Sequence, residues 1–148
     1  MRNRSAVFVV RNHKILMEKI YFENRYFYTI PGGGIEGDET PEEAALRELK
    51  EECGLDGVIV RKLTELYNNE RTEHIYEVKI PDNQEPILGS DPEFVGDDQP
   101  LRDVLWMDIK ELSEKDRAFL FRYGLIEIDG FLEEVMSWGE EISYPGMN

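Results

Sequence analysis

Short apolar and β-branched stretches alternate with polar turns through the first thirty residues. Ser5 to Val10 and Ile15 to Tyr21 are two such stretches, and Asn12 and His13 lie between them, which predicts a β-hairpin. A shorter aromatic strand is expected from Tyr26 to Ile30. This strand leads directly into a glycine-rich segment, which we interpret as a turn.

The segment after the glycines carries the signals for one helix, from its start to its end. Thr40 suits the N-cap, Pro41 suits the first helical position, and Glu43 completes a capping box with Thr40. Gly54 supplies the left-handed residue that ends a helix. The sequence therefore predicts a helix from Pro41 to Cys53.

The second half of the chain continues with strands and then helices. Val58 to Tyr67 and Glu73 to Ile80 predict a second hairpin, and Leu101 to Met107 predicts a further strand. A capping box at Asp108 starts a short helical turn, and a longer helix is expected from the cap Ser113 to about Tyr123.

Composition limits the possible partners and compartment. A chain of 148 residues fits one domain, and 32 acidic against 17 basic residues give a net charge of −15. Such a surface repels long RNA or DNA, and no cluster of Lys and Arg interleaved with aromatics offsets it. The apolar run near the N-terminus is too short for a membrane span, and the single Cys53 has no disulfide partner. We expect a cytoplasmic protein without a signal peptide or membrane segment.

Three glutamates share one face of the predicted helix. Glu51 and Glu52 follow Glu48 by three and four residues, which places them within about 60° of it around the helix axis. Like charges at this spacing destabilise a helix, so the cluster favours a hard divalent cation, Mg²⁺ or Mn²⁺, as its counter-charge. Periodicity alone also fits a solvated acidic face, and the flanking residues decide between the two.

Those flanking residues resemble the signature of the Nudix hydrolases, G-x5-E-x7-R-E-U-x-E-E-x-G-U, in which U is aliphatic. All of its fixed positions are filled, by Gly33, Glu39, Arg47, Glu48, Leu49, Glu51, Glu52, Gly54 and Leu55. The resemblance implies an α/β fold, a Nudix-type α/β/α sandwich with a mixed curved β-sheet. We expect a single domain over residues 1–148.

The resemblance also implies roles for the site residues. Glu48, Glu51 and Glu52 are expected to hold Mg²⁺ or Mn²⁺ together with the backbone carbonyl of Gly32, the residue before the signature. Arg47 is expected to orient Glu39 and the neighbouring carboxylates rather than touch the substrate. The remaining structural support comes from Gly33 and Gly54.

The activity implied is hydrolysis of a diphosphate (P–O–P) linkage in a small nucleotide, or in a nucleoside diphosphate linked to another group. A catalytically silent nucleotide-binding module on the same fold is the alternative, and the intact glutamates argue against it. Tyr26 and Tyr28, which strand alternation places on one face opposite Phe27, are candidates for stacking a base. Aromatics at this spacing also fit a core position.

The proton acceptor is not fixed by the signature. Residues 81–100 are dense in Pro, Gly, Asp and Asn, which predicts a long irregular loop over the site. Glu93 is our candidate for the general base, because it is a glutamate in the middle of this loop beside Phe94. Alternatively, Glu93 is a solvent-exposed loop carboxylate without a catalytic role, and Glu48 or Glu51 would then take the proton.

The end of the chain lies outside the resemblance. Leu125 to Trp138 is apolar enough to pack on this domain or on a second copy, so residues 125–148 form a possible C-terminal extension and the protein a possible homodimer.

Overall fold

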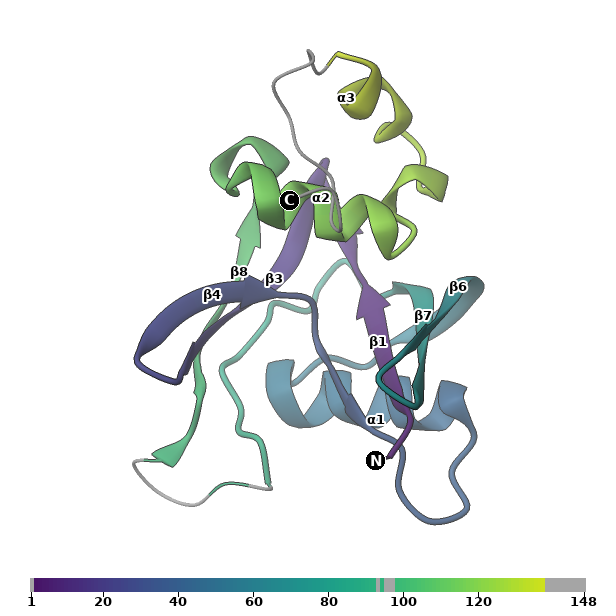
Figure 1. The fold of residues 1–148 in the computed structure, drawn as a ribbon, viewed down its shortest axis with the longest axis vertical. Coiled ribbons are helices and arrows are strands. Elements are labelled where there is room, and N and C mark those ends of the chain that lie inside the picture. Colours follow the sequence, from purple (N-terminus) through teal and green to yellow (C-terminus); the bar gives the residue numbers. More distant parts are fainter. Residues whose placement is uncertain (1, 93, 95–97, 138–148) are drawn as a thin grey trace.

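The structure is a computed structural model that describes residues 2–92, 94 and 98–137 (Figure 1). The strands are β1 (Arg4–Phe8), β2 (Val10–Arg11), β3 (Lys14–Phe22), β4 (Arg25–Thr29), β5 (Gly32–Gly34), β6 (Val58–Asn68), β7 (Arg71–Lys79) and β8 (Leu101–Met107). The helices are α1 (Pro41–Cys53), α2 (Glu114–Arg122) and α3 (Leu132–Met136), with 3₁₀ turns η2 (Ile109–Glu111) and η3 (Leu125–Glu127).

The strands form two sheets between helical layers. One sheet has the order β5-β1-β7-β6, and β1 runs parallel to β7 while its other pairs are antiparallel. In the second sheet β3 pairs antiparallel with β2, β4 and β8. Figure 1 shows α1 below the strands and α2 above them. The predicted α/β/α sandwich is therefore confirmed. The strands form two sheets where one was predicted, and the first of them is mixed because β1 runs parallel to β7.

The central strands are buried on both faces, which explains their nearly continuous apolar sequences. Val7 of β1 packs in one cluster with Leu49 of α1, whereas the next residue, Phe8, packs in a second cluster with Leu120 of α2. Because side chains alternate along a strand, one short strand can contribute to both cores. The helices on each side then exclude water from both faces of the sheet.

The helix signals in the sequence are confirmed. The Glu43 amide donates to Thr40 Oγ1 at 3.1 Å and the Thr40 amide donates to Glu43 Oε1 at 3.0 Å, which completes the capping box. Gly54 ends α1 in the left-handed conformation, with φ of 69°. Ser113 caps α2 as predicted, and its hydroxyl accepts from the Asp116 amide at 3.1 Å.

The first strand and the glycine segment differ from the prediction. The expected strand Ser5 to Val10 is divided at Val9 into β1 and β2, which belong to different sheets. The glycine segment is a strand, β5, that pairs antiparallel with β1. A Cβ atom at Gly32 would lie 2.6 Å from the Ser5 carbonyl oxygen, so the close approach of these backbones requires glycine.

The segment after α2 packs on this chain's own core. Leu125, Ile128 and Phe131 are buried, and the His13 ring stacks on Phe131 with 4.5 Å between ring centroids. Leu132 and Met136 of α3 are exposed. Residues 138–148 lie outside the described residues. In the described ranges, no helix is both long enough and apolar enough to cross a bilayer.

Candidate active site

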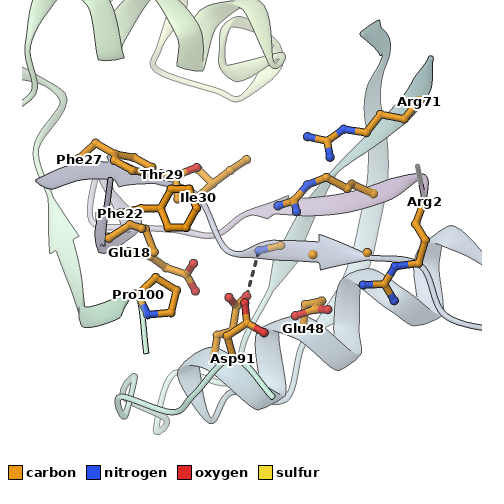
Figure 2. A pocket seen from close by; sticks show the side chains of 16 residues that line it. Arg2, Glu18, Phe22, Phe27, Thr29, Ile30, Glu48, Arg71, Asp91 and Pro100 are labelled. Carbon is orange, nitrogen blue, oxygen red and sulfur yellow. Dashed lines mark hydrogen bonds between the residues drawn. The ribbon is translucent and has the colours of Figure 1, made fainter. Parts of the chain in front are cut away.

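A cavity of about 380 Å³ opens beside α1 and β5, and its sides differ in chemistry. Figure 2 shows the carboxylates of Glu48 and Asp91 along the helix side. The rings of Phe22 and Phe27 lie on another side, and Arg71 lies across from them. The cavity therefore combines acidic, aromatic and basic surfaces.

The acidic side is built from three separate segments. Glu48 and Glu52 are one helical turn apart on α1, Glu18 comes from β3, and Asp91 comes from the loop that follows β7. Glu18 and Glu52 are only 2% and 4% exposed. The Gly32 amide donates to Glu52 Oε1 at 3.1 Å, the dashed bond in Figure 2, and fixes this side chain against β5.

The clustering shifts the protonation of these carboxyls. Burial raises the pKa of Glu18 and Glu52, and the negative charge of Glu48 and Asp91 raises both pKa values further. Burial also raises the pKa of Glu48, while the neighbouring Arg47 opposes that rise. These carboxyls therefore disfavour one another's ionised form.

Arg47 holds three of the signature glutamates in place. Its Nε donates to Glu39 Oε2 at 2.6 Å and its Nη2 to Glu39 Oε1 at 3.0 Å. Its Nη1 donates to Glu48 Oε1 at 3.0 Å and to Glu51 Oε2 at 3.1 Å. A last bond, from Nη2 to the Gly34 carbonyl at 2.9 Å, ties the side chain to β5. The structure therefore brings Arg47, Glu39, Glu48 and Glu51 together beside the cavity.

The two signature glycines have distinct structural roles. A Cβ atom at Gly33 would lie 2.3 Å from Glu48 Oε1, so glycine is needed for the Glu48 carboxylate to lie against β5. Gly54 ends α1 and directs the chain away from the helix. Gly32 lines the cavity beside Glu52.

The signature glutamates are not equally placed. Glu48 and Glu52 line the cavity, whereas Glu51 is not one of its lining residues and is held at the side by Arg47. Within the described ranges, no group of three or more His, Cys, Asp or Glu side chains is arranged to hold a metal ion. Hydrogen bonds from Arg47 and Gly32 engage oxygens of all three glutamates.

The loop after β7 reaches the site by completing the end of α1. The amides of Ile87, Gly89 and Ser90 donate to the carbonyls of Cys53, Glu52 and Glu51 at 2.8, 2.9 and 3.2 Å. These bonds hold the loop against the end of α1, and the next residue, Asp91, lines the cavity. The Gln99 side chain then brackets Asp91, accepting from its amide at 2.8 Å and donating to its carbonyl at 2.7 Å. Glu93, our candidate base, lies outside the described residues.

The aromatic side of the cavity differs from the one expected. Neither Tyr26 nor Tyr28 lines it, while Phe27 and Phe22 do. Tyr26 is exposed on the opposite face of β4 and packs on Tyr21 at 4.7 Å between ring centroids, and Tyr28 packs against the core. Tyr26 and Tyr28 thus lie on the other face of β4 from Phe27, as strand alternation predicts, and the pairing of β4 with β3 sets which of the two faces meets the cavity.

Sequence reasoning also missed Glu18 and passed over Asp91. A signal for Glu18 was present, since a carboxylate in the middle of the apolar stretch Ile15 to Tyr21 must be buried on one face or the other. Asp91 carried no such signal among the many acids of its loop.

The fold and the cavity define a class: α/β/α proteins with a carboxylate-lined cavity between a capped helix and a glycine strand. The sequence matches the NUDIX domain over residues 1–127. The chain therefore belongs to the Nudix hydrolase family, as the resemblance of its signature predicts.

Individual relatives match over much shorter stretches than the family does. The RNA pyrophosphohydrolase of Marinomonas sp. (strain MWYL1) is 69% identical over 29 residues, which are 20% of this chain and 18% of that protein. The 8-oxo-dGTP diphosphatase of Proteus vulgaris is 60% identical over 30 residues, 20% of this chain and 27% of that protein. The chain thus matches about a quarter or less of the length of each of these relatives.

Solved structures support the same fold over a longer range. A hydrolase of the NUDIX family from Clostridium perfringens superimposes with a TM-score of 0.64 at 19% identity, covering 86% of this chain and 98% of that one. At this identity the similarity establishes the fold alone.

Proposed function

We propose that the protein is a metal-dependent pyrophosphohydrolase that cleaves the P–O–P linkage of a small nucleotide, or of a nucleoside diphosphate linked to another group. The observation that carries the proposal is the gathering of Glu18, Glu48, Glu52 and Asp91 around one cavity, beside the complete signature. Two relatives named as a pyrophosphohydrolase and a diphosphatase support the reaction class.

The chemistry of these donors fits a hard divalent cation. Carboxylate and carbonyl oxygens suit Mg²⁺ and Mn²⁺. Burial and the neighbouring carboxylates raise the pKa of Glu52, and a cation bound there would favour its ionised form. Glu48, Glu51, Glu52 and the Gly32 carbonyl would hold it. A bound cation would neutralise the diphosphate and acidify a water molecule.

The chain's own residues orient the reactants. Gly32 fixes Glu52, and Arg47 fixes Glu48 and Glu51, so these carboxylates are positioned before substrate arrives. The glycines of β5 allow phosphate oxygens to approach the backbone closely. Phe27 and Phe22 offer their rings to a base. Glu93 takes the proton from the attacking water in our proposal, with Glu48 and Glu51 as the alternatives.

A panel of nucleotides with Mg²⁺, Mn²⁺ or a chelator tests the reaction. We expect release of a phosphate-bearing product from at least one substrate with metal, and none with the chelator. If no substrate is cleaved, the protein belongs to the alternative class of silent nucleotide-binding modules. Equilibrium binding of the same nucleotides would then identify its ligand.

Glu52→Gln tests the metal side of the cavity. Turnover at saturating metal should fall by at least about a hundredfold, because one ligating charge is lost without a change of shape. Without metal the melting temperature should be equal to or above that of the wild type, since burial and the charges of Glu18 and Glu48 all disfavour an ionised carboxylate at this position. Equal turnover of the two proteins would remove Glu52 from the site.

Charge and cysteine content support proposals about substrate size and cellular compartment. A small nucleotide rather than a long nucleic acid is favoured by the net charge of −15. The single cysteine, Cys53, is free and buried, in keeping with a reducing cytoplasm.

The exposed Leu132 and Met136 of α3 support a homodimer through this end of the chain. A monomer mass by light scattering at high concentration would contradict the dimer.

A further inference from the structure

Three arginines line the cavity in addition to its carboxylates and aromatic rings. Arg2 and Arg4 come from the start of the chain and Arg71 from the first residue of β7. Figure 2 shows Arg2 and Arg71 on the side opposite Phe22 and Phe27. Their side chains are 50%, 39% and 31% exposed for Arg2, Arg4 and Arg71, so solvent and a ligand can reach them.

The sheet register places Arg4 and Arg71 on one face. Arg4 is paired with Glu73 across the parallel β1–β7 ladder, and Arg71 precedes Glu73 by two residues on the same strand. Because side chains alternate along strands, Arg4, Glu73 and Arg71 point to the same side of the sheet. Phe8 marks that side as the one facing α2, away from the glutamates of α1.

Arg4 and Arg71 share a single close carboxylate partner, Glu73, among the described residues. Arg4 Nε lies 3.9 Å from Glu73 Oε1, and Arg71 Nη2 lies 3.2 Å from the same oxygen. Among the described residues, Glu73 is the single carboxylate within 4.0 Å of these two guanidinium groups. The charge of Glu73 balances only one of these two guanidinium groups, in a protein of net charge −15.

The basic and acidic sides belong to one cavity because β5 has no side chains to divide them. Gly33, paired with Ser5, presents its backbone to Glu48, and the next residue, Gly34, is paired with Arg4. A Cβ atom at Gly34 would lie 2.8 Å from the Arg2 guanidinium. The arginines also act on an acid of the same cavity: burial raises the pKa of Asp91, and the charges of Arg4 and Arg2 oppose that rise.

We infer that Arg4 and Arg71, assisted by Arg2, form an anion subsite for a phosphate group beyond the diphosphate that the enzyme cleaves. This inference rests on the proposed function and narrows its substrate class. The substrate is a nucleoside triphosphate or a similarly polyphosphorylated nucleotide, rather than a nucleotide sugar. Arginine suits this role because its planar guanidinium binds phosphate oxygens through two parallel hydrogen bonds.

The three sides of the cavity match the three parts of such a substrate. The rings of Phe22 and Phe27 suit the base, the carboxylates of α1 suit a metal-bound diphosphate, and the arginines suit the remaining phosphate. The sugar of a nucleotide sugar is neutral and would leave the guanidinium groups without an anion.

Binding of inorganic phosphates tests the subsite without hydrolysis. With Mg²⁺ present, calorimetry should show that the wild type binds a non-hydrolysable imido analogue of tripolyphosphate more tightly than the corresponding analogue of diphosphate. Arg4→Gln and Arg71→Gln should each remove about tenfold to a hundredfold of the affinity for the longer chain, the usual effect of losing a hydrogen bond to a charged group. Each single variant keeps one arginine on Glu73, so the sheet should stay folded.

Kinetics with a matched pair of substrates test the specificity. ATP and ADP-glucose share the ADP group and differ in whether a phosphate or a sugar follows it. The two variants should raise KM for ATP by about tenfold or more and leave KM for ADP-glucose nearly unchanged. Arg61→Gln is the control, because Arg61 is a strand arginine paired with a glutamate, Glu77, away from the cavity.

The outcomes separate the inference from the proposed function. Equal affinity of the wild type for the two inorganic analogues, or equal effects of the variants on ATP and ADP-glucose, would overturn the subsite while leaving the hydrolase intact. Arg71→Lys should restore part of the lost affinity, because it keeps the charge. A protein that cleaves neither nucleotide but still prefers the longer analogue would overturn the hydrolase and retain the subsite.

Discussion

The Arg47 guanidinium and the Glu39 carboxylate meet through two parallel hydrogen bonds, Nε to Oε2 at 2.6 Å and Nη2 to Oε1 at 3.0 Å. Glu39 also accepts from the Glu36 amide at 2.9 Å, so the same carboxylate shapes the loop before the helix. Arg47 in turn reaches Glu48 at 3.0 Å. The pair thereby joins the glycine strand, the loop and the acidic face of α1, and its loss should affect both stability and the site.

Glu39→Gln should lower the free energy of unfolding by about 2 kcal/mol at neutral pH, since it removes a charged partner from two hydrogen bonds. Arg47 chiefly lowers the pKa of Glu39. A lowered pKa in the folded state gives stability above the unfolded pKa of about 4.3, and that stability is lost as pH falls through the folded value. The difference between wild type and variant should therefore disappear in acid.

Urea unfolding at neutral pH and at about pH 3 measures both parts of this prediction. Glu36→Gln is the matched control from the same loop, because Glu36 is half exposed and 3.9 Å from Arg47. Its effect should stay within about 0.5 kcal/mol, as for other surface pairs. An undiminished effect of Glu39→Gln in acid would show that shape, and not charge, links the loop to the helix.

Gly33→Ala should lower turnover while the protein stays folded. The new Cβ atom would lie 2.3 Å from Glu48 Oε1, so the carboxylate must move away from β5. Misplacing a catalytic group by about 1 Å costs on the order of a hundredfold in rate. Turnover at saturating substrate and metal measures the effect, and circular dichroism checks the fold. Wild-type turnover would mean that the position of Glu48 against β5 is not required.

Phe27→Ala should raise KM for a nucleotide substrate by about fivefold to a hundredfold, the range expected for a stacked base. Tyr26→Ala is its matched partner, because the adjacent ring lies on the opposite face of β4, against Tyr21. Its KM should change little. The reverse result, a large effect at Tyr26 and none at Phe27, would assign base stacking to the face of β4 that carries Tyr26 and Tyr28.

Much of the fold follows from local signals in the sequence. Thr40, Gly54 and Ser113 mark helix ends through bonds to nearby backbone groups, so their roles could be predicted without the rest of the chain. The strand β5 could not, because glycines have a low strand propensity and this strand exists through its pairing with β1. The break at Val9 has the same origin, in two sheets that only the folded chain separates.

Some site residues could likewise be predicted from the sequence, and others could not. The positions of Glu48, Glu51 and Glu52 follow from the helical repeat and the matching signature. Glu18 and Asp91 reach the cavity from a strand and a loop, and their approach depends on tertiary packing that no local pattern encodes. Strand alternation separated Tyr26 from Phe27, but it could not tell which face meets the cavity.

The loop after β7 carries Glu93, the candidate proton acceptor. The bonds from residues 87–90 to the end of α1 carry the loop to the cavity and place Asp91 there, two residues before Glu93. If Glu93 is the base, Glu93→Gln should lower kcat by about a hundredfold or more and leave the affinities for Mg²⁺ and substrate nearly unchanged.

Asp91→Asn separates a proton acceptor from a carboxylate that only shapes the cavity. Asp91 is bracketed by Gln99 and faces the charges of Arg4 and Arg2, so its replacement should change substrate affinity more than kcat. The two variants would then differ in kind, one in kcat and the other in KM. Unchanged turnover of Glu93→Gln across the pH range would return the base to Glu48 or Glu51. Arg47 already holds both of these carboxylates beside the cavity.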